Sequence, residues 1–277
     1  MRTQLVALDI DGTLLDSRGE LPDGNARAVA EAVRRGVKVI LVTGRRWGMA
    51  RRVSASLNLP FPLIVHNGAL IKSPNGASRV FGCFINREVA VEILGVTQDY
   101  LPYTVLHRDV TADGQTVVHP SCLDNLMMQN YLRQFPNSVL ETASLPEMVD
   151  PELIQVMFGG ELGAMVKIET HLRNSGLLDR IKLTKTYYPE RNLGIVDVLH
   201  SNCSKGAALE FLAASYGICR EGVMAIGDNH NDLEMLQFAG IGVTVANCVD
   251  ELKGRGFRET SSNNNCGVAE ALRNFLD

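Results

Sequence analysis

The sequence predicts an α/β fold, a Rossmann-like doubly wound parallel sheet into which an α/β cap domain is inserted. At both ends of the chain, short apolar runs alternate with stretches of helical periodicity, which is typical of βαβ units around a parallel sheet. Between them, aromatic residues, prolines and glycines interrupt this pattern. We therefore expect a core of residues 1–82 and 190–277 and an inserted cap domain of residues 83–189.

The N-terminal segment predicts strand, helix, strand and a further strand. The apolar run at residues 4–9 is too short for helical periodicity and suits a strand covered on both faces. Asp23 can cap a helix whose apolar residues recur at helical spacing, and Gly36 can end it. Further strands are predicted at residues 37–42 and 61–66. The short connections between them indicate parallel pairing.

The C-terminal segment repeats this pattern. Ser204 can cap a helix that Gly217 closes, and an apolar run at residues 222–227 predicts a strand. A short helix at residues 232–239 and another strand at 240–245 follow. These units are of the same type as those at the start of the chain, so both ends are expected to build one sheet.

The middle of the chain has its own elements. Strand-like runs at residues 153–159 and 181–188 flank a helical stretch at residues 162–174. A chain of 277 residues is long enough for one large α/β domain or for two domains of ordinary size. An inserted second domain accounts for both observations.

The composition excludes several classes of protein. With 45% hydrophobic and 21% charged residues, the chain resembles soluble globular proteins, and we find no membrane span or signal peptide, so we expect a cytoplasmic protein that binds no membrane. A net charge of -4 without a basic cluster argues against nucleic acid as a partner. The cysteines form no C-x-x-C pair, so reduced thiols are expected rather than a zinc module or a disulfide framework.

Polar residues follow the predicted strands at the edge where ligands bind in parallel α/β sheets. Asp9 and Asp11 end the first strand, Thr43 follows the second, and Asp228 follows the strand after the insertion, while Lys205 opens a helix. Carboxylates gathered without paired cations repel one another, and a divalent cation is the simplest compensation. We therefore expect Mg²⁺, held by Asp9, Asp228 and the backbone carbonyl of Asp11.

This residue set suits phosphoryl transfer. Lys205 and the cation would neutralise phosphoryl oxygens, to which Thr43 and Asn231 could donate hydrogen bonds. One aspartate of the Asp9–Asp11 pair can attack phosphorus to form an aspartyl-phosphate, and the other can move the proton. The alternative for the pair is a calcium loop or a set of surface acids, although the glycine and acidic positions of an EF-hand are not matched here.

Four segments resemble the motifs of the haloacid dehalogenase superfamily of phosphatases. They occur in the family's order, and the tail of the chain is similar to the Cof-type branch, which carries a class II, subclass B cap inserted after the third strand. The segments are "DIDGTLLDS", "VTGR", "SKGAAL" and "GDNHNDLEML", with "HNGALI" after the third strand.

The resemblance implies a role for each matching residue. Asp9 matches the nucleophile and a metal ligand, and Asp11 matches the general acid/base, whose carbonyl also binds Mg²⁺. Thr43 and Lys205 match the phosphoryl-binding pair. Asp228 matches the acidic metal ligand.

Further positions are implied around these. Asn231 matches a phosphate-side donor and Asp232 an outer-shell partner of the metal site, and Gly44 and Arg45 stand in the substrate-binding motif. Arg45 either faces the substrate or pairs with an acid of the cap. The sequence departs from the family at His230, where glutamate is usual.

The expected function is Mg²⁺-dependent phosphatase action on small phosphorylated metabolites, sugar phosphates or related compounds, through an aspartyl-phosphate. A phosphomutase of the same fold and a phosphate-ligand binding module without turnover remain open alternatives. We expect a small-molecule phosphomonoester as the partner and a monomer or small homo-oligomer.

Overall fold

The computed structural model describes residues 2–111 and 113–276. The chain divides into two compact units, the first of Met1–Phe81 with Ser204–Asp277 and the second of Gly82–Cys203. Each unit has its own sheets and its own apolar core. Among the described residues, no helix is both long enough and apolar enough to cross a membrane.

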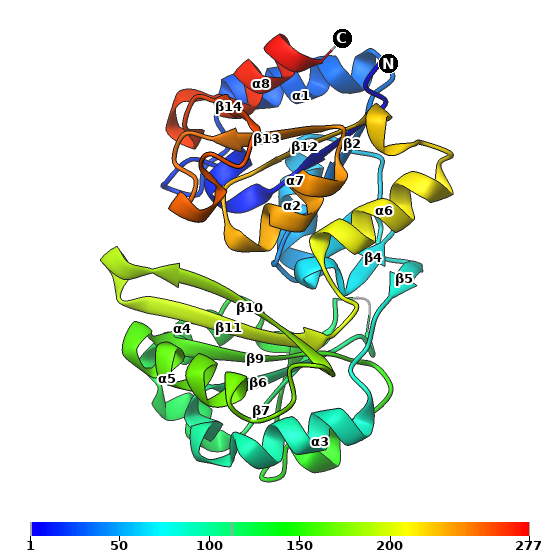
Figure 1. The fold of residues 1–277 in the computed structure, drawn as a ribbon. Helices are drawn as coiled ribbons and strands as arrows, with labels where there is room; N and C mark the ends of the chain where they lie inside the picture. Colours follow the sequence, from blue (N-terminus) through cyan, green and yellow to red (C-terminus); the bar gives the residue numbers. More distant parts are fainter. Residues whose placement is uncertain (1, 112, 277) are drawn as a thin grey trace. The chain divides into compact units, whose positions relative to one another are not determined.

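The first unit is built on a five-stranded parallel sheet with the strand order β14-β13-β12-β1-β2 (Figure 1). The chain leaves β1 toward β2 on one side and returns from the second unit to β12 on the other side, so the winding direction changes at β1. The strands are β1 (Leu5–Leu8), β2 (Lys38–Leu41), β12 (Val223–Gly227), β13 (Ile241–Val245) and β14 (Arg258–Thr260).

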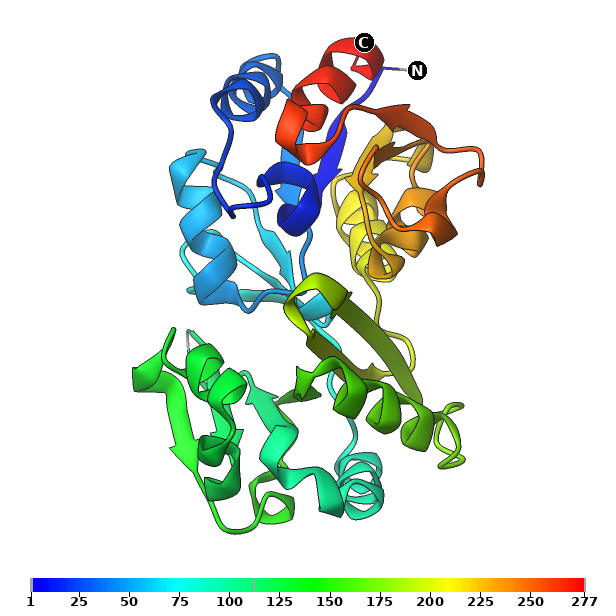
Figure 2. The ribbon, with the colours of Figure 1, turned by 90° about the vertical axis from the view of Figure 1, so that its left-hand side faces the viewer.

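Helices cover both faces of this sheet. Helices α1 and α8 lie side by side on one face, seen as a blue and a red helix in both views (Figure 2), while α6 and α7 pack together on the other. Alternate residues of β1 explain this arrangement, since Leu5 and Ala7 join the core formed with α6 and α7. The helices are α1 (Asp23–Arg34), α2 (Trp47–Ser56), α6 (Lys205–Ser215), α7 (Leu233–Phe238) and α8 (Gly267–Phe275).

A small antiparallel sheet in the order β3-β4-β5 follows α2. Its strands are β3 (Leu63–Val65), β4 (Leu70–Lys72) and β5 (Arg79–Gly82). The sequence predicted β3 as the third strand of the parallel sheet. In the structure, a single parallel bridge between Val42 and Ile64 links β3 to the end of β2. The rest of its pairing is antiparallel to β4.

The second unit contains a six-stranded, largely antiparallel sheet with the order β10-β11-β9-β6-β7-β8. Helices α3 and α5 pack on one face with Val156 and Phe158, and α4 packs on the other with Met157. The elements are α3 (Arg87–Val96), β6 (Thr104–Arg108), β7 (Gln115–Val118), α4 (Leu126–Leu132), β8 (Val139–Glu141), β9 (Leu153–Glu161), α5 (Leu162–Arg173), β10 (Ile181–Tyr188) and β11 (Leu193–His200).

The structure corrects one predicted boundary. The second unit ends at Cys203, whereas the sequence placed the end of the insertion at residue 189. Strand β11 belongs to the second unit because it pairs along its length with β10 and along most of it with β9. The expected cap at Asp23 is also shifted, since Pro22 precedes the first helical residue and Asp23 is that residue.

The α/β fold with a doubly wound parallel sheet is confirmed by this architecture.

Short helical turns connect these elements. The turns lie at Ile10–Leu14, His66–Gly68, Gln98–Tyr103, Pro120–Asp124, Pro136–Ser138, Pro146–Met148, Pro189–Arg191, Arg220–Gly222, His230–Asp232, Asp250–Leu252 and Asn263–Asn265.

Candidate active site

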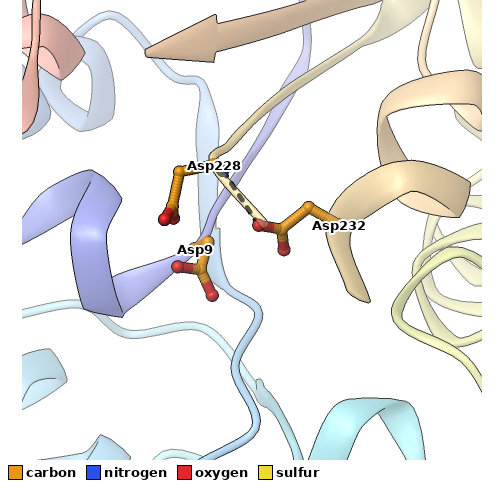
Figure 3. A group of neighbouring side chains, drawn as sticks. All are labelled: Asp9, Asp228 and Asp232. Atoms are coloured by element: carbon orange, nitrogen blue, oxygen red, sulfur yellow. Dashed lines mark hydrogen bonds between the residues drawn. The ribbon is translucent and has the colours of Figure 1, made fainter. Parts of the chain in front are cut away.

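Three buried carboxylates meet at the carboxyl ends of β1 and β12. Oxygen atoms of Asp9, Asp228 and Asp232 lie within 4.8 Å of one another, and Figure 3 shows Asp9 and Asp228 pointing into the same space. Asp9 directly follows β1 and Asp228 directly follows β12, and these two strands are hydrogen-bonded neighbours. Their proximity follows from the parallel pairing, which brings both carboxyl ends to one edge.

Lys205 is the cation of this cluster. Its Nζ donates to Oδ1 of Asp9 and to Oδ1 of Asp232, at 2.6 Å each, and its side chain is buried. Burial disfavours the charged form of Lys205, but the two neighbouring carboxylates outweigh this effect and raise its pKa. One ammonium thus faces three buried carboxylates, so the described side chains leave the cluster short of positive charge.

The pKa values of the carboxylates reflect this deficit. Burial is the main cause that raises the pKa of Asp9 well above its usual value, and Asp232, Asp228 and Asp11 add to it while Lys205 opposes it. Burial, followed by the charge of Asp232, raises the pKa of Asp228 to about 7. A cation bound between Asp9 and Asp228 would relieve both effects.

Asp232 has a different position in the cluster. Its Oδ1 is held by Lys205, and its Oδ2 accepts from the backbone N–H groups of Asp228 and Asn229 at 2.9 Å each. Both carboxylate oxygens of Asp232 are therefore already engaged. This residue fixes the turn after β12 and orients Lys205. Among the described residues, Asp9 and Asp228 each keep one carboxylate oxygen without a hydrogen bond.

An irregular turn at Ile10–Leu14 carries Asp11 past the cluster. Gly12 has a φ of +80°, and a Cβ built on it would lie 2.4 Å from Oδ2 of Asp228, so no other residue fits. The next residue, Thr13, is buried and donates from Oγ1 to Oδ1 of Asp228 at 2.7 Å. The turn thus positions Asp228, a contact that sequence reasoning missed.

Three asparagine side chains hold this turn from outside. Asn247 donates to the carbonyl of Gly12 at 2.8 Å, Asn25 to that of Leu14 at 2.9 Å, and Asn263 to that of Leu15 at 3.0 Å. The irregular backbone cannot satisfy these carbonyls within a regular helix, so side-chain amides do so. We call Asn25, Asn247 and Asn263 the asparagine clasp.

Arg45 pairs with Asp11. Its Nε and Nη2 donate to the two carboxylate oxygens of Asp11 at 2.7 and 2.6 Å. The sequence left two roles open for Arg45, facing the substrate or pairing with an acid of the cap. The contact with Asp11 is neither of these. The partner is the second aspartate of the Asp9–Asp11 pair, within the first unit.

Thr43, Gly44 and Asn231 are linked through Asn67. The backbone N–H of Asn67 donates to the carbonyl of Thr43 at 3.0 Å, and its Oδ1 accepts from Nδ2 of Asn231 at 2.9 Å. A Cβ on Gly44 would lie 2.9 Å from the same Oδ1. Oδ1 of Asn231 is buried and has no hydrogen-bond partner among the described residues, which is typical of an atom that a ligand or water satisfies.

Asn67 was missed as a site residue, although its place after the third strand was a usable signal. It lies in a turn with φ of 54°, and Gly68 beside it has φ of +96°. A Cβ on Gly68 would lie 2.1 Å from the carbonyl oxygen of Ser204, so this glycine allows the turn to approach the first residues of α6. Ser204 caps α6 by accepting from the N–H of Ala207, as the sequence predicted.

The sequence of the chain matches the family of haloacid dehalogenase-like hydrolases over residues 6–272. It is 30% identical over 288 residues to the Bacillus subtilis protein YxeH, covering 99% of this chain and 98% of that protein. It is 29% identical to the 5-amino-6-(5-phospho-D-ribitylamino)uracil phosphatase YwtE of Bacillus subtilis, covering 98% and 97%.

The fold agrees with these matches. A haloacid dehalogenase-like hydrolase from Bacteroides thetaiotaomicron superposes with a TM-score of 0.81 at 23% sequence identity, covering 98% of this chain and 99% of that one. The family match extends over both units and includes every residue of the cluster. The chain therefore belongs to the haloacid dehalogenase-like hydrolases, and it is an enzyme of the phosphatase type.

Proposed function

We propose that this enzyme is a Mg²⁺-dependent phosphatase that hydrolyses small phosphorylated metabolites, sugar phosphates or related compounds, through an aspartyl-phosphate at Asp9. The observation that carries the proposal is the buried cluster of Asp9, Asp228 and Asp232 around the single ammonium of Lys205. A binding module would need the positive charge but not a second aspartate two residues after the first.

The donor set supports Mg²⁺ as the cofactor. Open carboxylate oxygens on Asp9 and Asp228, with the backbone carbonyl of Asp11, would hold the ion, and all are hard oxygen ligands. When bound, Mg²⁺ would neutralise negative charge on the substrate's phosphoryl oxygens. Asp232 would serve outside the ligand set, because its two oxygens are engaged.

Asp9 is the proposed nucleophile. The carboxylate oxygen of Asp9 that does not hold the ion would attack phosphorus and carry the phosphoryl group, and Lys205 lies beside this carboxylate. Lys205 would also stabilise the charge on the transferring group, together with hydrogen bonds from Thr43, from the Gly44–Arg45 segment and from the second amide proton of Asn231. Each donor lies in a turn at the same edge of the sheet as Asp9.

Asp11 is the proposed general acid/base. In the first step it donates a proton to the leaving alkoxide, and in the second it accepts a proton from the water that attacks the aspartyl-phosphate. The two hydrogen bonds from Arg45 orient its carboxylate, and they suit the ionised form that the second step requires. Donation in the first step would require Asp11 to loosen this pair.

The substrate class rests on the relatives. YwtE is named for a substrate with a phospho-D-ribityl group, which is a small phosphomonoester. We further propose that the second unit is the inserted cap domain of the family and that it selects the leaving group. A cytoplasmic location is part of the same proposal, supported by the six cysteines, all of which are thiols in the structure.

A nucleophile variant tests this function. Asp9→Asn should abolish Mg²⁺-dependent phosphate release from p-nitrophenyl phosphate and from a panel of sugar phosphates, because an amide is not a competent nucleophile. Asp23→Asn, an exposed carboxylate in the same unit, is the matched control and should retain the activity. Phosphate release by Asp9→Asn at the unaltered rate would contradict the proposal.

A further inference from the structure

Asn67 joins two segments that the proposed function places around the phosphoryl group. Its backbone N–H donates to the carbonyl of Thr43 at 3.0 Å, which connects the turn after β3 to the segment after β2. Its side-chain Oδ1 accepts from Nδ2 of Asn231 at 2.9 Å, which connects the same turn to the turn after β12. Asn67 is 2% exposed, and all three residues belong to the first unit. Asn67 therefore links two of the proposed phosphoryl donors.

We propose that Asn67 is a positioning residue of the phosphatase reaction, a role that rests on the function proposed above. By accepting one amide proton of Asn231, Asn67 fixes the orientation of that amide. The second amide proton of Asn231 is then directed to an oxygen of the transferring phosphoryl group. In this role Asn67 acts through Asn231 and needs no contact with substrate.

The orientation of the Asn231 amide matters because its two ends have opposite hydrogen-bonding roles. The nitrogen is a donor and the oxygen is an acceptor. If the amide were rotated by 180°, Oδ1 of Asn231 would face both Oδ1 of Asn67 and the phosphoryl oxygens, so acceptors would face acceptors. The hydrogen bond to Asn67 thus stabilises the orientation in which a donor faces the phosphoryl group.

This orientation is kept at a cost in stability. Oδ1 of Asn231 is buried and has no hydrogen-bond partner among the described residues. A buried acceptor without a partner destabilises a fold, because the acceptor has lost its hydrogen bonds to water. Such a departure from full hydrogen bonding is typical of groups at functional sites.

Close packing and a favourable backbone hold the side chain of Asn67 in place. A Cβ on Gly44 would lie 2.9 Å from Oδ1 of Asn67 and 3.3 Å from its Nδ2, so this side chain lies against the backbone of Gly44. The φ of Asn67 is 54°, a left-handed conformation that asparagine adopts more readily than most other residues. The acceptor for Asn231 is therefore in place before substrate binds.

A double-mutant cycle between Asn67 and Asn231 tests this role. Asn67→Gly removes the side chain at a position whose positive φ suits glycine, so the turn is retained. We expect kcat/KM for p-nitrophenyl phosphate at saturating Mg²⁺ to fall by about tenfold, the effect of losing one well-placed hydrogen bond. Asn231→Ala should fall at least as far. The double variant should fall no further than Asn231→Ala alone, because Asn67 acts through Asn231.

Asn58→Gly is the matched control. Asn58 has a φ of 51°, close to that of Asn67, but it is exposed and lies between α2 and β3. The same substitution at the same backbone conformation should therefore leave kcat/KM at the wild-type value.

The binding of inorganic phosphate separates this proposal from the phosphatase function, because it needs no turnover. Titration calorimetry of the Mg²⁺-loaded protein measures the Kd. We expect the Kd for inorganic phosphate to rise by about tenfold in Asn67→Gly, and to be no higher in the double variant than in Asn231→Ala. If the wild type hydrolysed no phosphomonoester, the proposed function would fail, and the binding cycle would still test the action of Asn67 on Asn231.

Either of two results would overturn the proposal. One is a double variant whose loss is the product of the two single losses, which would mean that Asn67 acts independently of Asn231. The other is an Asn67→Gly variant that keeps both the wild-type kcat/KM and the wild-type Kd for inorganic phosphate.

Discussion

The guanidinium of Arg45 holds both carboxylate oxygens of Asp11, with hydrogen bonds of 2.7 and 2.6 Å. A planar guanidinium makes two parallel bonds to a carboxylate, which a lysine ammonium cannot reproduce. The pair joins the turns after β1 and β2, and it sets the direction of the proposed general acid/base before substrate arrives.

Arg45→Lys should therefore lower kcat by about tenfold, which corresponds to the loss of one charge-assisted hydrogen bond worth about 1.5 kcal/mol. The measurement is steady-state phosphate release at saturating Mg²⁺. Arg52→Lys, at an exposed position of α2, is the matched control and should behave as wild type. An unchanged kcat for Arg45→Lys would mean that the pair does not position Asp11 for catalysis.

Gly12→Ala should abolish activity. The added methyl group would lie 2.4 Å from Oδ2 of Asp228, and the positive φ adds backbone strain. Gly19→Ala separates these two causes, because Gly19 has the same φ of +80° but no neighbour within 4 Å of a Cβ. The control should lose about 1 kcal/mol of stability in urea unfolding and keep its activity. Equal loss of activity in both variants would assign the effect to strain alone.

The asparagine clasp should support the rate of catalysis, although none of its three residues lies in the four segments that resemble the family's motifs. Asn263→Asp keeps the shape but replaces the donor to the Leu15 carbonyl with an acceptor, leaving a buried group unsatisfied at a cost of about 1–3 kcal/mol. We expect lower kcat with little change in KM, and faster hydrogen exchange in the turn at Ile10–Leu14.

The neighbouring Asn264→Asp is the control for the clasp. Asn264 is exposed and accepts from the N–H of Ser17 through Oδ1, a role that an aspartate retains. Its kcat and hydrogen exchange should match the wild type. If Asn263→Asp also matched the wild type in kcat and in hydrogen exchange, the asparagine clasp would not support the turn.

The affinity for Mg²⁺ should depend on pH near neutrality. The pKa of Asp228 is raised to about 7 without a metal, and a ligand carboxylate must be ionised. Below that pH, protonation competes with the ion, so the Kd for Mg²⁺ should rise by about tenfold per pH unit. Titration calorimetry at pH 6 and pH 8 measures this, and equal Kd values would exclude Asp228 as a ligand.

The same shift predicts how the metal changes stability. A carboxylate whose pKa is raised on folding stabilises the fold below its unfolded pKa, and this contribution is lost as pH rises through about 7. The free energy of unfolding of the metal-free protein should therefore fall between pH 3.8, the usual pKa of an aspartate, and about pH 7 because of Asp228. Added Mg²⁺ should raise the unfolding midpoint more at pH 8 than at pH 6, as measured by differential scanning calorimetry.

Much of the site could be predicted because it follows from strand order. Asp9, Asp228 and Lys205 come together for a reason visible in the sequence: each follows a buried strand or opens a helix at the edge where parallel strands end. Spacing along the chain was sufficient there. The α/β class could be predicted for the same reason, since it rests on periodicity.

The missed contacts depend on irregular backbone. Thr13 and Asn67 act from turns with positive φ at or beside them, and Asn263 reaches the turn after β1 from the C-terminal segment. No periodic pattern marks such positions. The boundary at residue 189 was wrong because the Pro189–Arg191 turn resembles a break between domains, although it only connects two paired strands.

In the proposed mechanism, Asp9 carries the phosphoryl group during turnover. The most direct measurement is acid quench of the enzyme during steady-state hydrolysis, followed by borohydride reduction and peptide mapping. We predict that Asp9, within the tryptic peptide of residues 3–18, is converted to homoserine, because borohydride reduces an aspartyl-phosphate and releases its phosphate. An enzyme that turns over while Asp9 is unmodified, or that carries the phosphoryl group on another residue, would contradict the account.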